Sequence, residues 1–180
     1  MKIYLSSIGC RLNQSEIESM GRQLLAQGHE IVKDVASADK AVINTCAVTS
    51  QAARDARSQT RQIQRKNSSS DIYLTGCYAT VAPNELQQFN GSVTVVANKD
   101  KSRLIQILDP LFTADDMPFD QEPIMREFLS GHMGNTRAFV KVQDGCENKC
   151  TFCITTIARG AGKSRHLAHI VSEEQALSSA

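Results

Sequence analysis

The sequence has no excess of charge of either sign, since 20 Lys and Arg residues stand against 19 Asp and Glu residues and the net charge is +1. A balanced chain has no overall attraction to polyanions, so a nucleic-acid site would depend on local clusters of basic residues. No apolar run is long enough to cross a bilayer, and the first residues, MKIYLSSIGCRLNQSE, become polar too soon for a secretory signal peptide. These absences predict a cytoplasmic protein with no membrane partner.

Internal repeats and low-complexity tracts are also missing, and 41% hydrophobic with 22% charged residues is typical of a folded globular protein. The sequence does contain six cysteines. Disulfides are rare in a reducing compartment, so these cysteines favour metal ligation or catalysis. An even count would also suit three disulfides, and the spacing of the cysteines therefore has to decide.

The first hundred residues alternate short apolar segments with longer amphipathic ones. Strands are predicted over KIYLS, EIVKD, KAVINT, DIYLT and VTVVAN, and helices over residues 15–27, 50–66, 84–89 and 101–112. This β-α-β-α order with short connections predicts an α/β fold, in which helices flank a parallel sheet.

The hydrophobic periodicity is lost over residues 113–135, where Pro, Asp and Gly accumulate. We therefore expect an amino-terminal α/β domain over residues 1–112, a linker over 113–135, and a second unit over 136–180. This second unit contains one predicted strand, RAFVKVQ, then a cysteine-rich loop, and then a predicted helix, LAHIVSEEQALSSA.

Cys10, Cys46 and Cys77 each stand just after a predicted strand. The carboxyl ends of parallel strands lie on one edge of a sheet, so these cysteines can converge there. Free cysteines are often small core residues, but three at equivalent positions, with no other cysteine in the first 145 residues, favour a shared site. Three thiolates lack the fourth ligand of a closed zinc site, whereas an iron–sulfur cluster with one open iron fits them better.

Cys146, Cys150 and Cys153 form a C-x-x-x-C-x-x-C pattern in the segment CENKCTFC. The GKS that follows resembles the end of a phosphate loop. The first glycine of that motif would stand at position 157, however, and this residue is Ile157. The phosphate loop is therefore rejected.

Zinc is the runner-up for this second group, because a fourth ligand could come from a histidine. The candidates are His132, His166 and His169, and none stands at the usual paired spacing. A disulfide between residues so close together is less favoured in a cytosolic chain. The spacing instead favours a [4Fe–4S] cluster whose open iron binds a substrate or cofactor.

The motif CENKCTFC resembles the cluster-binding motif of the radical S-adenosylmethionine enzymes, and its surroundings, RAFVKVQDGCENKCTFCITTIARG, resemble the tRNA methylthiotransferases. The segments GCRLNQSEIE, NTCAVT and TGCYAT are similar to the three amino-terminal cysteine sites of that family. NTCAVT and FVKVQDGC look most like the branch that acts on N6-threonylcarbamoyladenosine, rather than the isopentenyladenosine or ribosomal-protein branch. The resemblance covers almost the whole chain.

This resemblance implies two [4Fe–4S] clusters. Cys146, Cys150 and Cys153 would hold the one that binds S-adenosyl-L-methionine and, after reduction, cleaves it to a radical that attacks C2 of the adenine. The second cluster would carry the sulfur to be inserted, and a second S-adenosyl-L-methionine would supply the methyl group. Its implied ligands are Cys10, Cys46 and Cys77.

The implied substrate is N6-threonylcarbamoyladenosine beside the tRNA anticodon, and the implied partners are tRNA and an electron donor such as a flavodoxin or ferredoxin. The implied fold is a Rossmann- or flavodoxin-like methylthiotransferase domain, followed by the start of a radical S-adenosylmethionine barrel. A complete barrel takes about 200 residues, but only 43 residues follow Arg137. We therefore expect a fragment, in which the rest of the barrel and a carboxy-terminal RNA-binding domain are missing.

Several polar residues near the cysteines have open interpretations. Asn13 and Asn44 could donate hydrogen bonds to cluster sulfurs or serve turns and caps equally well. A stripe of arginines at helical spacing could bind phosphates or form a solvated helix face, with Ala52, Ala56 and Ile63 opposite. A second basic group follows the second cysteine cluster and has a better claim to substrate or cofactor contact. The stripe is Arg54, Arg57, Arg61 and Arg65, and the second group is Arg159, Lys163 and Arg165.

Overall fold

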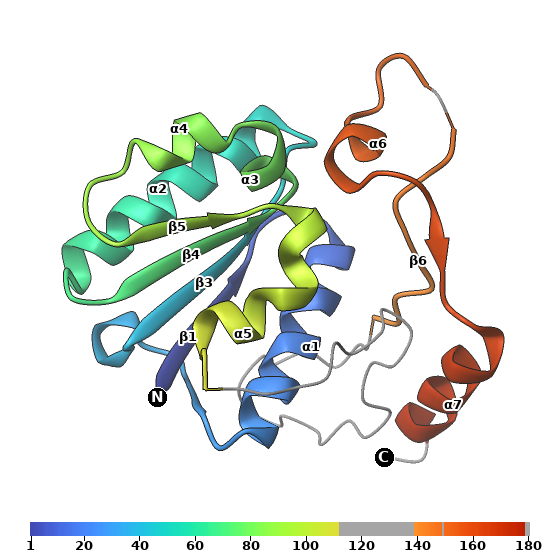
Figure 1. Cartoon of the computed structure of the whole chain (residues 1–180), viewed down its shortest axis with the longest axis horizontal. Coiled ribbons are helices and arrows are strands. Elements are labelled where there is room, and N and C mark those ends of the chain that lie inside the picture. Colours follow the sequence, from blue (N-terminus) through green and yellow to red (C-terminus); the bar gives the residue numbers. More distant parts are fainter. Residues whose placement is uncertain (112–138, 149, 179–180) are drawn as a thin grey trace.

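One five-stranded parallel sheet organises the first part of the chain. Figure 1 shows the computed structural model, which describes residues 1–111, 139–148 and 150–178. The strand order is β2-β1-β3-β4-β5, and all four pairings are parallel. The predicted α/β fold is confirmed, and this order is the one found in flavodoxin-like folds. The strands are β1 (Lys2–Ser7), β2 (Glu30–Val32), β3 (Lys40–Thr45), β4 (Asp71–Gly76) and β5 (Val93–Val96).

Helices cover both faces of the sheet (Figure 1). One face carries α1 (Arg11–Ala26) and α5 (Leu104–Leu108), which follows the 3₁₀ helix η2 (Asn98–Arg103). The other face carries α2 (Ser50–Lys66), α3 (Cys77–Val81) and α4 (Pro83–Gln87), while a short 3₁₀ helix, η1 (Val35–Ser37), precedes β3. Because β3 and β4 are covered on both sides, nearly all their residues are buried.

Two apolar cores hold these layers together. Ile17 and Leu24 of α1 pack with Ile3, Val42 and Leu104 on one face. The second core contains side chains of α2, α3 and α4 against β3 and β4. Its members include Ala56, Ile63, Tyr78 and Leu86, together with Ile43 and Leu74.

The predicted helix over residues 50–66 is confirmed at both ends, and the Thr49 hydroxyl caps it by accepting a hydrogen bond from the Ala52 amide at 3.1 Å. Helix α1 begins earlier than predicted, and helix α3 was not predicted. Helix α1 starts at Arg11 because Cys10, in an extended conformation, is its N-cap. Helix α3 starts at Cys77, directly after β4. Two of the first three cysteines therefore stand at helix starts.

The second unit expected over residues 136–180 is called the second segment from here on. Its described part contains α6 (Ile154–Arg159), α7 (Leu167–Ser178) and two short strands, β6 (Gln143–Asp144) and β7 (Lys163–Ser164). The carboxy-terminal helix was predicted, whereas α6 was not. β6 and β7 pair in antiparallel fashion.

The strand predicted over residues 137–143 was too long, since residues 139–142 are not in a strand and 137–138 lie outside the described residues. One backbone carbonyl in residues 139–142 bonds to a side chain of α1, and another extends the pairing of β6 with β7. The Phe139 carbonyl accepts from the Ser15 hydroxyl at 2.9 Å, and the Val142 carbonyl accepts from the Arg165 amide at 3.0 Å. The start of a barrel in this segment remains a prediction, and the predicted linker over residues 113–135 lies outside the described residues.

The second segment lies against the carboxyl edge of the sheet, where α6 packs on α3 (Figure 1). None of the helices in the described ranges combines the length and hydropathy that a membrane span requires.

Candidate functional site

Three cysteines stand at the carboxyl ends of three neighbouring strands. Cys10 follows β1, Cys46 follows β3 and Cys77 follows β4, and these strands are consecutive in the sheet. Cys46 and Cys77 are buried, whereas Cys10 is exposed. The strand order reverses between β1 and β3, and ligands of open α/β sheets bind in the crevice at that point.

Two glycines allow the three cysteine-bearing loops to touch. Gly9 has φ +95°, and a Cβ added there would lie 2.3 Å from Cβ and 2.7 Å from Sγ of Cys46. Gly76 has φ +97°, and its added Cβ would lie 2.3 Å from the carbonyl oxygen of Thr45. Both positions combine a left-handed backbone with no room for a side chain, so only glycine fits them.

The other three cysteines form one loop that closes on itself. The Cys146 amide donates to the Gly160 carbonyl at 3.1 Å, and the Cys153 amide donates to the Cys150 carbonyl at 3.2 Å. Cys153 is also the N-cap of α6. Hydrogen bonds from the side chain and backbone of Thr155 lower the pKa of the Cys153 thiol, which favours the thiolate form.

The donor atoms suit iron–sulfur clusters, because each group offers three thiols and cysteine thiolates are the usual ligands of such clusters. The close approach of Gly9 to Cys46 also keeps the first two loops together. Within the described residues, however, no three His, Cys, Asp or Glu side chains are grouped closely enough to hold a metal ion. The structure thus places Cys10, Cys46 and Cys77 on one edge without drawing their thiols together.

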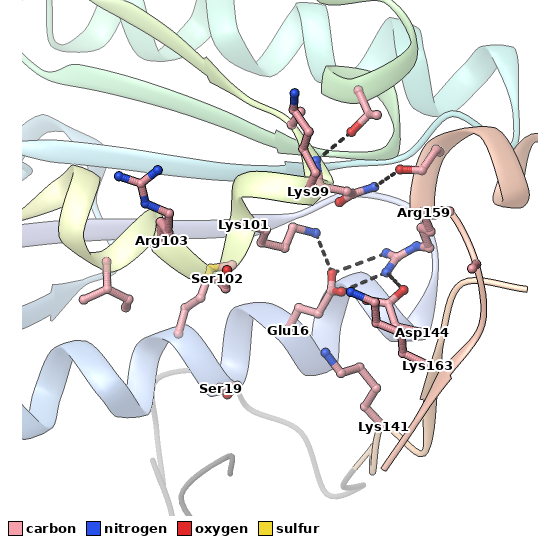
Figure 2. A pocket seen from close by; sticks show the side chains of 18 of the residues that line it. Glu16, Ser19, Lys99, Lys101, Ser102, Arg103, Lys141, Asp144, Arg159 and Lys163 are labelled. Carbon is pink, nitrogen blue, oxygen red and sulfur yellow. Dashed lines mark hydrogen bonds and ion pairs between the residues drawn. The ribbon is translucent and has the colours of Figure 1, made fainter. Parts of the chain in front are cut away.

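A buried carboxylate, Glu16, lies next to this edge and binds two cations. Its Oε2 accepts from Lys101 Nζ at 2.8 Å, and its Oε1 accepts from Arg159 Nη1 at 2.8 Å. Arg159 Nη1 also donates to Asp144 Oδ1 at 2.7 Å, and Arg159 Nη2 donates to Asn13 Oδ1 at 2.8 Å. Figure 2 shows Lys101 and Arg159 pointing at Glu16 from different elements. Glu16 was not singled out from the sequence, although it stands three residues after Asn13 and therefore shares its helix face.

The two asparagines beside the cysteines brace the backbone of the loops. Asn13 Nδ2 donates to the carbonyls of Ile8 and Thr45 at 2.9 and 3.0 Å. Asn44 Nδ2 donates to the carbonyl of Asn13 at 3.0 Å and to Glu16 Oε2 at 2.9 Å. Both side-chain amides donate to oxygen atoms. Of the two roles left open by the sequence, donation to cluster sulfurs or a structural role in turns and caps, the structure therefore supports a structural role, the bracing of the backbone.

Burial and charge act in opposite directions on this network. Burial would raise the pKa of Glu16, but attraction to Lys101 and the hydrogen bond with Arg159 hold that pKa far below its usual range. Burial lowers the pKa of Lys101 more than Glu16 raises it. Burial also acts to lower the pKa of Arg159, but the hydrogen bond with Glu16 and the attraction of Glu16 and Asp144 together outweigh burial and raise that pKa. The Glu16 carboxylate and the Arg159 guanidinium are therefore both held in their charged forms.

Asn98 is another side chain that connects the first cysteine group to the second segment. Its Nδ2 donates to the Ala158 carbonyl at 2.7 Å and lies 3.8 Å from Cys77 Sγ. Its Oδ1 is buried without a hydrogen-bond partner. No sequence pattern singled out Asn98, because it follows β5, a strand without a cysteine.

A protein-family model described as "Uncharacterized protein family UPF0004" matches residues 2–98. This chain belongs to that family. The matched residues contain the whole sheet and the first three cysteines, so the sheet edge described above is part of the UPF0004 domain.

Curated relatives extend the match into the second segment. The chain is 34% identical to the threonylcarbamoyladenosine tRNA methylthiotransferase MtaB of Aquifex aeolicus, over 98% of this chain and 45% of the relative. It is 36% identical to MtaB of Chlamydia pneumoniae, over 94% of this chain and 38% of the relative. It is also 32% identical to the tRNA-2-methylthio-N(6)-dimethylallyladenosine synthase of Zymomonas mobilis, over 97% of this chain and 40% of the relative.

These relatives confirm the predicted membership of the methylthiotransferase family and its likeness to the threonylcarbamoyladenosine branch. The chain spans less than half the length of these curated relatives.

The arginine stripe of the UPF0004 domain is partly used within the fold. Arg57 donates to the Tyr78 hydroxyl and to Glu85 Oε2, and the Arg61 guanidinium carbon lies 5.6 Å from the ring centroid of Phe89. Arg54 donates to Gln51 of its own helix. Half of the stripe therefore holds α2 against its neighbours, which weakens its prediction as a phosphate site.

The second basic group divides in the same way. Arg165 is buried, and it donates to Glu173 at 2.7 Å and to the Lys141 carbonyl at 2.9 Å, so it holds α7 in place. Lys163 is exposed. Of the histidines proposed as zinc ligands, His166 and His169 have ring centroids 6.0 Å apart, and His132 lies outside the described residues.

A cleft of about 1020 Å³ lies between the UPF0004 domain and the second segment (Figure 2). Two acidic side chains of its described lining, Glu16 and Asp144, are bound within the buried network. Within the described residues, three of the basic side chains that line the cleft have no hydrogen-bond or ion-pair partner, namely Lys99, Arg103 and Lys163. The cleft thus has a net positive lining. Its basic residues are Lys99, Lys101, Arg103, Lys141, Arg159 and Lys163.

Proposed function

We propose that this chain is part of a tRNA methylthiotransferase that modifies C2 of N6-threonylcarbamoyladenosine beside the anticodon. Cys10, Cys46 and Cys77 would hold one [4Fe–4S] cluster. The second cluster and S-adenosyl-L-methionine would be bound at the other three cysteines. Those residues are Cys146, Cys150 and Cys153.

One structural observation supports this proposal most directly. Three cysteines end three neighbouring parallel strands, and glycines at positions 9 and 76 bring their loops into contact. A structural role in the core would not require the exposed Cys10 and the buried Cys46 to follow neighbouring strands. The names of the curated relatives supply the reaction and the substrate.

The chain's own residues have distinct tasks in this proposal. When bound, the clusters and S-adenosyl-L-methionine supply the radical chemistry that an unactivated aromatic C–H bond requires. Asn13 fixes the loops of the first two cysteines through their backbone carbonyls. Asn98 stands beside Cys77, where it can donate to sulfur. The cleft supplies cations for the phosphates of an RNA strand.

Iron, sulfide and zinc analysis after anaerobic reconstitution tests the cofactor part of the proposal. Two clusters correspond to about eight irons per chain, and a Cys10→Ala or a Cys146→Ala variant should lose about half of them. The two variants remove ligands from different groups, so each is the control for the other. Stoichiometric zinc without sulfide would contradict the proposal.

Mass spectrometry of tRNA nucleosides tests the substrate. Cells that lack the gene should lose 2-methylthio-N6-threonylcarbamoyladenosine and retain the methylthio form of the dimethylallyl-type nucleoside. Loss of the latter alone would assign the chain to the branch of the Zymomonas mobilis relative instead. The cytoplasmic location and the flavodoxin or ferredoxin partner remain predictions from the sequence.

A further inference from the structure

The buried arginine at the end of α6 joins the two cysteine-bearing parts of the chain. We propose that Arg159 is a positioning residue, which, held by Glu16, fixes the cysteine loop 146–153 against the carboxyl edge of the sheet. This inference rests on the proposed function, because it explains how two cofactor-binding cysteine groups would be kept at a defined separation.

Within the second segment, hydrogen bonds at Arg159 and its neighbour Gly160 hold both ends of the cysteine loop. Its Nη1 donates to Asp144, two residues before Cys146, at 2.7 Å. Gly160, the next residue, accepts the hydrogen bond of the Cys146 amide at 3.1 Å. Helix α6 runs from its N-cap, Cys153, to Arg159 itself. A fixed guanidinium therefore fixes the entry and the exit of the loop.

On the opposite side, Arg159 binds residues that brace the first cysteine group. Its Nη1 and Nη2 contact both oxygens of Glu16, at 2.8 and 3.3 Å, and its Nη2 donates to Asn13 Oδ1 at 2.8 Å. The side-chain amide of Asn13 in turn holds the carbonyls of Ile8 and Thr45. Those carbonyls stand two residues before Cys10 and one residue before Cys46.

The third loop is reached through the neighbour of Arg159 in α6. The Ala158 carbonyl accepts from Asn98, whose amide also lies 3.8 Å from Cys77 Sγ. Ala158 is only 2% exposed and Cys77 only 5%. Helix α6 therefore covers the region of Cys77, and a loosened helix would uncover it.

The Arg159–Glu16 pair is buried, since both side chains are only 4% exposed. Neither charge can therefore turn to solvent when its partner is removed. Removal of one partner from a buried pair leaves an uncompensated charge, which is strongly destabilising. A planar guanidinium can bind Glu16, Asp144 and Asn13 at once, whereas a lysine ammonium cannot match this fork. Replacement of Arg159 should therefore release α6 from the sheet edge.

Alkylation of individual cysteines by iodoacetamide, read by mass spectrometry on the metal-free chain under reducing conditions, measures this release. In an Arg159→Met variant we expect Cys77 to react at least about tenfold faster, which corresponds to about 1.4 kcal/mol of lost docking free energy. The rate at Cys10 should stay the same, because this residue is already exposed. An unchanged rate at Cys77 would overturn the proposal.

Arg165→Met is the matched control, because it breaks another buried ion pair, Arg165–Glu173, within the second segment. This variant should leave the Cys77 rate unchanged, and an equal acceleration in both variants would reduce Arg159 to a general stabilising residue. Arg159→Lys should give an intermediate rate at Cys77, since it keeps the positive charge but loses the planar set of N–H donors of the guanidinium. If Arg159→Met does not fold, as judged by circular dichroism, Glu16→Gln provides the same test and should accelerate Cys77 less.

The failures of the two proposals can be told apart. The alkylation rates are measured without clusters, so a wild-type chain that binds no iron would refute the proposed function and leave these rates interpretable. Conversely, equal rates in wild-type and Arg159→Met chains would refute the positioning role even if both chains bound two clusters.

Discussion

Gly9 lies so close to Cys46 that a Cβ at position 9 would stand 2.3 Å from the Cβ of the cysteine. The contact joins the loops that follow β1 and β3, and the positive φ of Gly9 makes it possible. The relative position of Cys10 and Cys46 therefore depends on the absence of one methyl group.

A Gly9→Ala substitution should destabilise the chain more than the backbone conformation alone explains. Left-handed strain costs about 1–2 kcal/mol for alanine, and the clash with Cys46 should add about 1–3 kcal/mol. Urea unfolding measures the sum. Gly28→Ala is the control, because Gly28 also has a positive φ, +78°, but an added Cβ meets nothing within 4 Å. Equal losses in the two variants would show that the approach to Cys46 is unimportant.

The buried carboxylate should make stability depend on pH in the acidic range. The pKa of Glu16 is lower in the folded chain than its ordinary value of 4.5, so the unfolded chain binds the proton more tightly. The stabilisation is therefore present above about pH 4.5 and is lost as the pH falls below it. In Glu16→Gln, unfolding free energy should drop by roughly 3–5 kcal/mol at neutral pH and fall less steeply with acid. Urea unfolding between about pH 6 and pH 3 measures both effects.

Glu85→Gln is the control for this pH dependence, because Glu85 also pairs with an arginine but its side chain is 58% exposed. Exposed pairs contribute only about 0–1 kcal/mol. If the acid slope of Glu16→Gln matched that of the wild-type chain, another carboxylate would have to be responsible.

The bracing role of Asn13 predicts a loss of iron as well as of stability. An Asn13→Ala variant leaves the buried carbonyls of Ile8 and Thr45 without their side-chain donor, which should cost about 1–3 kcal/mol for each group left unsatisfied. After reconstitution, it should bind less iron at the first cysteine group. Iron and sulfide analysis together with urea unfolding measures the two consequences.

Asn67→Ala separates these consequences. Asn67 also bridges two carbonyls, of Val35 and Ala38 at 2.9 and 2.8 Å, but it follows α2, away from the cysteines. It should lower stability and leave the iron content intact. A parallel loss of iron in both variants would mean that iron binding responds only to overall stability.

The basic cleft predicts where RNA phosphates bind. Combined replacement of Lys99, Arg103 and Lys163 by glutamine should weaken binding of an anticodon stem-loop RNA. Each lost phosphate contact should flatten the slope of log affinity against log salt by about 0.7–0.9. Fluorescence anisotropy over a KCl series measures this slope.

Replacement of Arg54 and Arg65 on α2 provides the comparison for the cleft. These arginines belong to the stripe that the sequence suggested, and both are exposed. The cleft variant should lose more affinity than the stripe variant. The reverse order would restore the helix stripe as the RNA surface.

The sheet and the placement of the first cysteines could be predicted because the signals are local. Short β-branched segments such as KAVINT alternate with amphipathic helices, and each of the first three cysteines ends such a segment. The helices α3 and α6 were missed, since α3 follows β4 with no connecting residue and α6 begins directly after Cys153, the last cysteine of its loop. The strand over residues 137–143 was overestimated, and the Phe139 carbonyl bonds to the Ser15 side chain, which lies elsewhere in the sequence, instead of to another strand.

The buried network could not be predicted, because its members are far apart in the chain. Nothing near Glu16 indicates that it will bind Lys101 and Arg159, and Asn98 has no cysteine within its own segment. The arginine stripe shows the opposite case. Its helical spacing was correct, but the ring of Phe89 and the carboxylate of Glu85, which occupy Arg61 and Arg57, come from later segments.

The distance in sequence between Glu16 and Arg159, 143 residues, has a consequence for biosynthesis. Domains fold from the amino terminus while the chain is still being synthesised. The sheet must therefore fold first around a carboxylate whose available cation is Lys101, 85 residues away. Arg159 leaves the ribosome later, and only then can the loop with the last three cysteines take its place against a sheet edge that has already formed.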